Sequence, residues 1–288
     1  MTLETLSAAP LTTLDRKACP DCACRTRCLL GRQDEAVRAA WEPHVRERRF
    51  RKGEVLQRQG HVPATTQVLK VGTVLLQRRA ADGVDRPVGM AGCGQAMGTS
   101  ALLQRPADLS CVAVAPGRVC EIDVARLQRN GLLGNDFFRE LAIDQWKGQA
   151  LLADWARILH IRGSAGQLAG ALLLIADLQR SSLVRLPSHS VLAALLFTTR
   201  ETVARGVALL TREGGLVRHD RWHGEIVRNR LTELARGQQP GHGAGQAAAG
   251  PTAAAAATAS TAPARQAGLA GSFSSACTSA ASACAPLP

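Results

Sequence analysis

No stretch of the sequence is apolar for long enough to cross a membrane. The longest apolar runs, such as residues 168–176, fall well short of the roughly 18 residues that a transmembrane helix needs. The N-terminal segment also lacks a basic start followed by an apolar run, so the sequence predicts no signal peptide. We therefore expect a cytoplasmic protein with no membrane partner.

Two common motifs of catalysis and nucleotide binding are missing as well. The sequence contains neither a phosphate-binding loop of the type G-x-x-x-x-G-K-[ST] nor a nucleophile elbow of the type G-x-S-x-G. We therefore expect that the protein is not an enzyme.

Acidic residues are scarce relative to basic ones. The chain has 35 Lys and Arg against 23 Asp and Glu, which gives a formal net charge of +12. A surplus of this size suits a polyanionic partner such as DNA better than an acidic protein surface. Part of the surplus lies in residues 46–51 (RERRFR), which we interpret as a solvated face, with phosphate contact as the alternative.

The sequence does contain enough apolar residues for more than one core. Its 288 residues are 46% hydrophobic, which suffices for two modest domains. Between residues 36 and 135, short β-type runs alternate with glycine-containing turns, a pattern typical of a β-barrel or sandwich. The predicted strands are 54–56, 66–71, 74–78, 88–90, 110–114 and 118–124.

Residues 136–162 are predicted to form one long helix. Apolar residues recur there at steps of three and four, among them Phe137, Leu141, Trp146 and Trp155. Such a stripe either packs into the protein's own core or forms the seam of a dimer, and the pattern alone leaves both open.

Residues 163–236 have the pattern of a winged helix-turn-helix. Helices are predicted at 167–180, 188–196 and 199–213, followed by a strand-turn-strand at 216–227. From residue 237 to residue 288 the chain is rich in Ala and Gly, and we expect this tail to be disordered. The predicted fold class is α+β, with a barrel after a cysteine-rich segment at residues 1–35.

The last of these helices carries side chains suited to reading bases. Thr198 and Glu201 have the spacing of a capping box, which places the start of the helix there. Arg200, Glu201 and Arg205 then fall in its N-terminal half, where a recognition helix meets base edges. Arginine can bond to guanine O6 and N7, and glutamate can accept from cytosine N4. The alternative is that Glu201 and Arg205, one turn apart, only pair with each other.

This segment resembles the recognition helix of the CRP/FNR family of transcription regulators. That family has a Glu-Thr-Val/Ile-x-Arg core, which residues 201–205 (ETVAR) match, and a wing follows at the expected distance. The resemblance implies a jelly-roll barrel of cyclic-nucleotide-binding type, a homodimer formed through the long helix, and a near-palindromic DNA site with TGA half-sites. It also implies RNA polymerase as a partner. The implied DNA-binding residues are Thr199, Arg200, Glu201, Ala204 and Arg205.

The sequence departs from that family at two places. Phe197-Thr198 replaces the usual Gly-Leu of the turn, which puts phenylalanine where glycine often adopts positive φ. In the barrel, Thr99 stands where cyclic-nucleotide binders have the ribose-binding glutamate, and Leu109-Ser110 replaces their phosphate-binding Arg-Ser pair. Because a buried phosphate needs a cation, we expect no tight binding of cyclic AMP.

The nine cysteines favour metal ligands or free thiols over disulfides, since cytosolic reductants keep thiols reduced. Four of them lie within the segment CPDCACRTRCLLG, namely Cys19, Cys22, Cys24 and Cys28. This density indicates a metal site, and the spacing alone leaves zinc and an iron–sulfur cluster open. We interpret Cys24 as a spare ligand or a mere neighbour, and Cys93 and Cys111 as buried small residues of the barrel.

The cysteine pattern resembles that of FNR-type regulators within the same family. Those proteins hold a 4Fe–4S cluster with three N-terminal cysteines spaced C-x2-C-x5-C and a fourth in a distant Cys-Glu-Ile motif. Cys19, Cys22 and Cys28 have that spacing, and Cys120 begins the motif Cys-Glu-Ile. The resemblance implies a cluster on these four residues that senses oxygen, with nitric oxide as the alternative signal. The alternatives are a structural zinc ion without a redox response and a thiol switch without metal.

Overall fold

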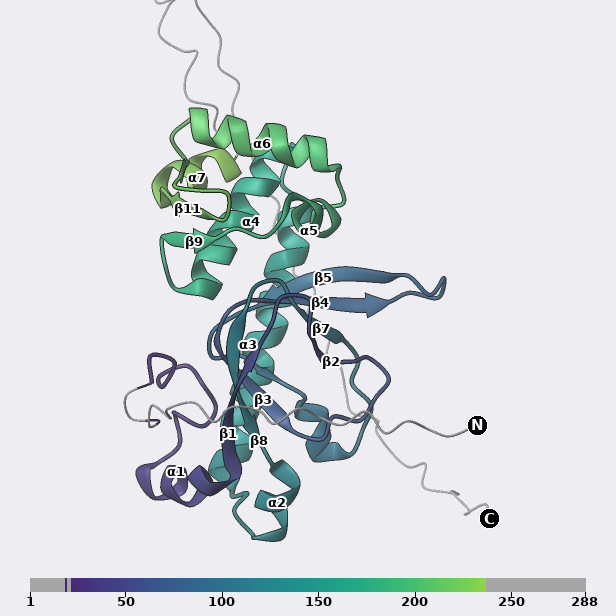
Figure 1. Ribbon diagram of the computed structural model, residues 1–288, viewed down its shortest axis with the longest axis vertical. Helices are drawn as coiled ribbons and strands as arrows, with labels where there is room; N and C mark the ends of the chain where they lie inside the picture. The colour runs from purple at the N-terminus through teal and green to yellow at the C-terminus, as the bar shows by residue number, and fades with distance from the viewer. Residues whose placement is uncertain (1–18, 20–21, 237–288) are drawn as a thin grey trace, which may run out of the picture. The chain divides into compact units, whose positions relative to one another are not determined.

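The computed structural model describes residues 19 and 22–236 (Figure 1). The tail that we expect to be disordered lies outside the described residues. Every helix within the described part of the chain is too short or too polar to span a bilayer.

The barrel consists of two four-stranded antiparallel sheets. In order across the first sheet are β1 (Val45–Phe50), β8 (Gly117–Ile122), β3 (Thr66–Val71) and β6 (Ala96–Met97). The second has β2 (Val55–Gln57), β7 (Ser110–Ala113), β4 (Val74–Arg79) and β5 (Asp85–Ala91). Each predicted strand overlaps an observed one, and the predicted fold class is confirmed.

Apolar side chains from both sheets fill the space between them. This buried cluster comprises Phe50, Leu56, Leu69, Val74, Ala91, Met97, Cys111, Ala113 and Val119. The prediction that Cys111 is a small buried residue of the barrel is therefore confirmed, since its exposed fraction is 2%.

Most of the basic stretch at residues 46–51 lies in strand β1, which was not among the predicted strands because its charged residues mask the strand pattern. Its ends, Val45 and Phe50, are buried, while Arg46 and Arg49 are exposed. Arg48 instead donates to Glu121 of the neighbouring strand at 2.7 Å. The interpretation as a solvated face thus fits Arg46 and Arg49, whereas Arg48 is occupied within the barrel.

Short helices connect and flank the barrel strands. Before it lie α1 (Glu35–Trp41) and the 3₁₀ turn η2 (Glu42–His44), and η3 (Thr99–Leu103) follows β6. After β8 come α2 (Val124–Arg129) and the long helix α3 (Asn135–Leu159). On α3, the apolar stripe packs into the chain's own core through Phe137, Leu151, Trp155 and Ile158. Phe138 and Trp146 on the same helix remain 50% and 67% exposed.

The C-terminal part is a winged helix-turn-helix. Its helices are α4 (Ser164–Gln179), α5 (His189–Leu195), α6 (Arg200–Arg212) and α7 (Arg228–Ala235). Three short strands, β9 (Leu183–Arg185), β10 (Leu216–Arg218) and β11 (His223–Ile226), pair antiparallel in the order β10-β11-β9. Because α4 is apolar on nearly every side, it forms the centre of this module's core.

Candidate cysteine centre and nucleic-acid interface

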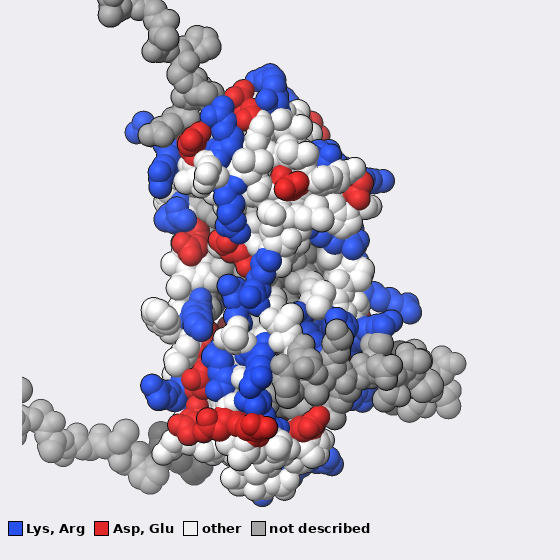
Figure 2. Space-filling model, turned by 90° about the vertical axis from the view of Figure 1, so that its left-hand side faces the viewer, with Lys and Arg blue, Asp and Glu red and all other residues white. Residues whose placement is uncertain are grey.

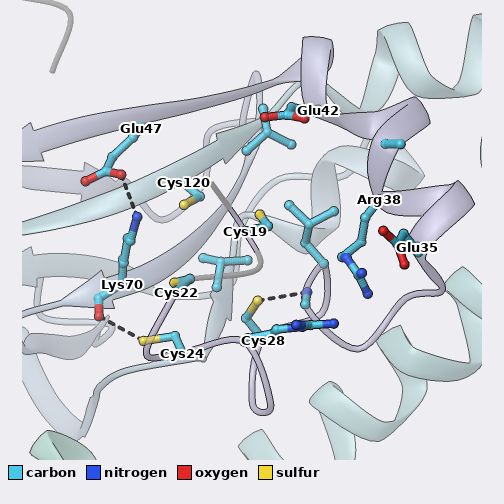
Figure 3. A pocket seen from close by; sticks show the side chains of 16 residues that line it. Cys19, Cys22, Cys24, Cys28, Glu35, Arg38, Glu42, Glu47, Lys70 and Cys120 are labelled. Carbon is cyan, nitrogen blue, oxygen red and sulfur yellow. Dashed lines mark hydrogen bonds and ion pairs between the residues drawn. The ribbon is translucent and has the colours of Figure 1, made fainter. Parts of the chain in front are cut away.

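A cavity of about 180 Å³ brings together cysteines that are far apart in the sequence (Figure 3). It lies between the cysteine loop, which we define as residues 22–33, helix α1, and strands β1, β3 and β8. All four predicted ligands, Cys19, Cys22, Cys28 and Cys120, line this cavity. Cys120 comes from β8, and the other three come from the loop or directly precede it.

Consecutive turns wind the cysteine loop around the cavity. The backbone N–H of Cys22 donates to Cys19 at 3.2 Å, and that of Cys28 donates to Cys24 at 3.0 Å. Gly31 closes the loop so tightly that an added Cβ would lie 2.2 Å from the carbonyl oxygen of Arg25. The backbone N–H of Gly31 donates to Cys28 Sγ at 3.0 Å. This glycine thus allows the close approach and supplies a hydrogen bond to a candidate ligand.

Burial favours the protonated form of two of the cavity thiols, Cys28 and Cys120. It raises the pKa of Cys28 to about 11, although the Gly31 N–H acts in the opposite direction. Burial likewise raises the pKa of Cys120 to about 12, against the lowering effect of Lys70. Binding of a metal as thiolates therefore displaces protons, and a group that carries substantial positive charge is needed to hold these sulfurs in ionised form.

The cysteine thiols that line the cavity are the type of donor that metal centres use. A zinc ion binds each sulfur at about 2.3 Å, so its four ligands must crowd around one point. Among the described residues, no three His, Cys, Asp or Glu side chains converge closely enough to hold a single metal ion. In a 4Fe–4S cluster the cysteines bind different irons, which allows wider separation of the sulfurs. Four cysteine thiols around one cavity are a donor set that suits an iron–sulfur cluster and also suits zinc.

Cys24 and Cys93 form a disulfide, so the expectation of metal ligands or free thiols instead of disulfides is wrong for this pair. Cys24 is therefore neither a spare ligand nor a mere neighbour, and the interpretation of Cys93 as a simple buried residue is wrong. The pairing crosses 69 positions of sequence, so no local spacing could have revealed it.

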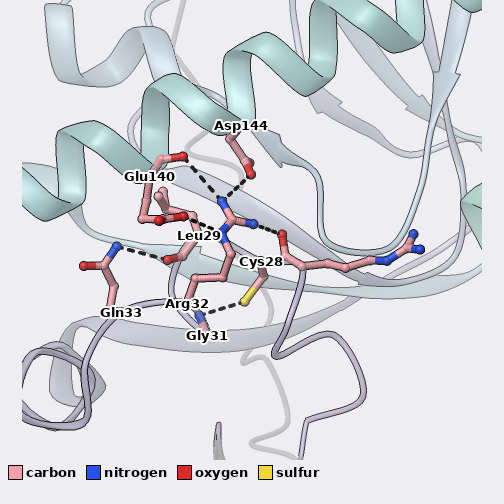
Figure 4. A network of polar contacts seen from close by, with 8 residues as sticks. Cys28, Leu29, Gly31, Arg32, Gln33, Glu140 and Asp144 are labelled. Atoms are coloured by element: carbon pink, nitrogen blue, oxygen red, sulfur yellow. Dashed lines mark hydrogen bonds and ion pairs between the residues drawn. The ribbon is translucent and has the colours of Figure 1, made fainter.

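Arg32 ties the cysteine loop to the long helix α3 (Figure 4). Its guanidinium donates to Asp144 at 2.8 Å and also to Glu140, both on α3. Leu29 of the same loop is completely buried and packs in one cluster with Phe137 of α3. The loop that carries the candidate ligands is thus fixed to α3 by both charge and apolar contact.

The loop also touches the first helix of the winged helix-turn-helix module. The Arg180 guanidinium, just after α4, donates to the carbonyl oxygen of Ala23 at 2.8 Å. In addition, the backbone N–H of Cys93 donates to the carbonyl oxygen of Leu178 at 3.2 Å. These bonds connect the cysteine loop and its disulfide partner to the end of α4.

The positions that would hold a cyclic nucleotide make other contacts. The Thr99 hydroxyl accepts from Gln145 Nε2 at 3.0 Å, and the Ser110 hydroxyl accepts from the backbone N–H of Gln59, also at 3.0 Å. The absence of tight cyclic AMP binding stays a prediction that calorimetry can test.

The five predicted DNA-binding residues share one exposed face of α6. Thr199, Arg200, Glu201, Ala204 and Arg205 are all exposed, whereas Val203, Gly206, Val207 and Leu210 are buried beneath them. In the described part of the chain, Glu201 and Arg205 form no ion pair; Arg205 instead donates to the Thr202 hydroxyl at 3.4 Å. Both side chains are therefore available to bind a partner.

The start of α6 differs by one residue from the predicted capping box. Thr199, not Thr198, is the N-cap, and its hydroxyl accepts from the backbone N–H of Thr202 at 3.1 Å. The backbone amide at the helix start and the Thr199 hydroxyl lower the pKa of Glu201. Glu201 is consequently an ionised acceptor at neutral pH, as contact with cytosine N4 requires.

The turn before α6 has the backbone that glycine would favour. Phe197 has a φ of +51° and its side chain is 68% exposed. Phenylalanine thus adopts the left-handed backbone that glycine usually adopts at this position, at a steric cost.

Basic side chains are spread over much of the face shown in Figure 2, in keeping with the net charge.

Comparisons with known proteins agree with this architecture. Residues 47–129 match the family model of the cyclic nucleotide-binding domain, which runs here from β1 to the end of α2. No curated protein matches the sequence.

Several solved structures resemble the chain. FixK2 from Bradyrhizobium japonicum has 19% identity, with 66% of this chain and 96% of FixK2 covered and a TM-score of 0.57. A CRP/FNR-family regulator from Thermus thermophilus has 20% identity, coverages of 67% and 100%, and a TM-score of 0.52. The c-di-GMP-responsive regulator CLP from Xanthomonas campestris has 16% identity, coverages of 67% and 99%, and a TM-score of 0.52. The protein thus has the fold of CRP/FNR-family transcription regulators.

Proposed function

We propose that this protein is a sequence-specific DNA-binding transcription regulator of the CRP/FNR family, in which a 4Fe–4S cluster in the cysteine cavity makes DNA binding depend on oxygen. The observation that carries the proposal is the convergence of Cys19, Cys22, Cys28 and Cys120 on one buried cavity. Their loop is bonded to α3, the helix through which we expect two copies to associate.

The exposed face of α6 would contact DNA. Arg205 and Arg200 can each donate two hydrogen bonds to guanine, and Glu201 can accept from cytosine. The buried residues behind this face hold it against α4, so the contacting side chains stand on a rigid element. In a homodimer two such helices read a near-palindrome with half-sites about one helical turn apart.

The four cysteines would hold the cluster, which when bound supplies a redox-sensitive iron–sulfur centre. Gly31 donates its N–H to Cys28 Sγ, and such hydrogen bonds to sulfur tune the potential of these centres. The Lys70 ammonium pairs with Glu47 at 2.6 Å at the cavity wall, with both side chains buried. This pair thus forms part of the cavity wall.

The cysteine loop transmits the state of the cavity to α3. With the four thiols unligated, the loop loses its link to Cys120. It keeps its contacts to α3 through Arg32 and Leu29, its bond to the end of α4, and its disulfide to the barrel. Movement of Arg32 then removes the cation next to Glu140 and Asp144. We expect this to disturb the exposed face of α3, where Phe138 and Trp146 offer apolar area to a second copy.

Elemental analysis and visible spectroscopy test for the cofactor. Full-length protein is purified under nitrogen and reconstituted with iron and sulfide, and its iron, sulfide, zinc and visible spectrum are measured. We expect about four irons per chain and a brown colour that bleaches in air. Cys28→Ser and Cys120→Ser should lose both, whereas the control Cys111→Ser, a thiol of the barrel core, should keep them.

Other outcomes identify the alternatives. A colourless protein with stoichiometric zinc would support a structural metal site without redox response. A protein that binds neither metal, yet changes its DNA affinity with thiol oxidation, would support a metal-free thiol switch. Either result would overturn the cluster and leave DNA binding to be judged separately.

A further inference from the structure

We propose that Cys24 and Cys93 form a reversible disulfide, a thiol-oxidation site that is distinct from the four-cysteine centre and acts as a second redox input. The two residues are bonded, and their Cα atoms lie 6.3 Å apart, within the range of ordinary disulfides. Cys24 belongs to the cysteine loop and Cys93 to the turn between β5 and β6. The bond therefore fastens the loop to the barrel.

The site is arranged to accommodate the reduced state as well. Cys24 Sγ lies 3.0 Å from the carbonyl oxygen of Lys70, as Figure 3 shows. When the disulfide is reduced, the Cys24 thiol can donate to this oxygen without leaving its position. The Cys24 side chain is 3% exposed, and its sulfur has a partner in either redox state. That partner is Cys93 when the pair is oxidised and the Lys70 carbonyl oxygen when it is reduced.

The disulfide also determines which cysteines remain for the centre. Cys24 lines the same cavity as the four candidate ligands. A Cys₄ cluster has no use for a fifth thiolate, and a fifth thiol beside it would compete for iron. Pairing with Cys93 removes Cys24 from that competition.

The contacts around Cys93 extend the effect to the DNA-binding module. Its backbone N–H donates to Leu178 in α4, and Gly92 packs so closely that an added Cβ would lie 2.5 Å from the Leu178 carbonyl oxygen. On the other side, an added Cβ on Gly94 would lie 2.7 Å from Arg27 Cβ of the cysteine loop. The oxidised bond therefore holds together the cysteine loop, the β5–β6 turn and the end of α4.

Reversibility follows from where such a protein works. This step rests on the proposed function, because a transcription regulator acts in a compartment where thiols are kept reduced, and disulfides there are mostly transient or redox-sensing. The pairing itself rests on the geometry alone.

The chemistry balances with a hydroperoxide as oxidant. The Cys93 thiol, the less buried of the two, attacks one peroxide oxygen, so that an S–O bond forms, the O–O bond breaks and the first water leaves. The Cys24 thiol then attacks the sulfenic sulfur, the S–S bond forms, and the hydroxyl departs with the thiol proton as a second water. Two thiols and one hydrogen peroxide thus give one disulfide and two waters. A dithiol reverses the reaction by exchange.

The test uses full-length protein and mass spectrometry. Protein reduced under nitrogen, with and without bound iron, receives one equivalent of hydrogen peroxide, and the remaining thiols are blocked with N-ethylmaleimide. Trypsin then releases Cys24 within residues 18–25 and Cys93 within residues 80–118, because it does not cleave before Pro87 or Pro106. We expect a cross-linked pair of these peptides that disappears after dithiothreitol.

Variants identify the sulfurs and make the result decisive. Cys24→Ser and Cys93→Ser should abolish the cross-link, and Cys111→Ser, which alters the other cysteine of residues 80–118, should keep it. In wild type the oxidation should also slow tryptic cleavage after the exposed Arg27 severalfold. Overturning results are a cross-link that survives Cys93→Ser, Cys24 joined to another loop cysteine, or no cross-link. Because the readout needs neither iron nor DNA, these outcomes are distinct from failure of the cluster proposal.

Discussion

Arg32 donates to the Asp144 carboxylate at 2.8 Å, which joins the loop carrying the candidate ligands Cys22 and Cys28 to the long helix α3. Asp144 is 7% exposed and Arg32 15% exposed, so the pair is largely removed from water. Burial raises the pKa of Asp144, and Arg32 works against this rise. Arg32 thus favours the ionised form of this carboxylate.

We expect Arg32→Gln to destabilise the protein by about 2–4 kcal/mol, because it leaves Asp144 and Glu140 without their cation in a partly buried site. Urea unfolding at neutral pH measures this. The control is Arg157→Gln, which removes an exposed pair with Asp154 on the same helix and should cost about 0.5 kcal/mol or less. Equal effects of the two variants would show that Arg32 is not a structural tie.

Glu54 provides a test of pH dependence in the barrel. Burial alone would raise its pKa, but the backbone N–H of Arg51 at 2.9 Å and the Arg48 side chain lower it below 4.5. Because the folded-state pKa is lower than the unfolded one, Glu54 stabilises the fold above about pH 4.5 and loses this effect as the pH falls through the folded value. The free energy of unfolding should therefore be higher for wild type than for Glu54→Gln at about pH 6, and this difference should shrink toward zero near pH 3. A difference that does not change with pH would contradict this assignment.

Arg205→Ala should relax the choice of DNA sequence. If Arg205 contacts guanine, its loss costs about 1–3 kcal/mol of discrimination against a wrong base pair. Fluorescence anisotropy with specific and random duplexes measures the ratio of affinities. Arg212→Ala, at the far end of α6 and 75% exposed, serves as the matched control and should leave that ratio unchanged. Equal weakening on both duplexes by Arg205→Ala would instead make Arg205 a phosphate contact.

Phe197→Gly should stabilise the winged helix-turn-helix module. The φ of +51° costs a non-glycine residue about 1–2 kcal/mol, and glycine gives back part of that gain through its more flexible unfolded state. We expect a net gain of up to about 1 kcal/mol, measured as a higher unfolding midpoint. Because Phe197 is largely exposed, little packing is lost. A clear loss of stability would mean that the phenyl ring has an unrecognised partner.

Periodic features of the sequence predicted most of the fold. Strands bounded by glycine and the helical period of α3 were recognised because burial imposes those patterns locally. Strand β1 was missed, since its outward side chains are arginines and only Val45 and Phe50 mark the core face. The start of α6 was misplaced by one residue because Thr198 and Thr199 are both suitable caps, and only the backbone geometry decides between them.

The sequence alone predicted the candidate ligands of the site but not the residues that position them. Spacing and resemblance identified Cys19, Cys22, Cys28 and Cys120, which line one cavity in the structure. The partners that position them were not predictable. Arg32 and Asp144 are 112 residues apart in the sequence, and Cys24 and Cys93 are 69 residues apart. Contacts between such distant residues leave no periodic signal in a single sequence.

The most direct test of the account is the affinity of the iron-loaded protein for a duplex with two TGA half-sites, measured under nitrogen and again after exposure to air. We predict tight binding by a dimer under nitrogen and, after air, a fall of about 5- to 150-fold together with loss of the dimer in sedimentation. Cys120→Ser should bind weakly under both conditions. Equal affinity before and after air, with the iron lost, would contradict the claim that the cysteine centre controls DNA binding.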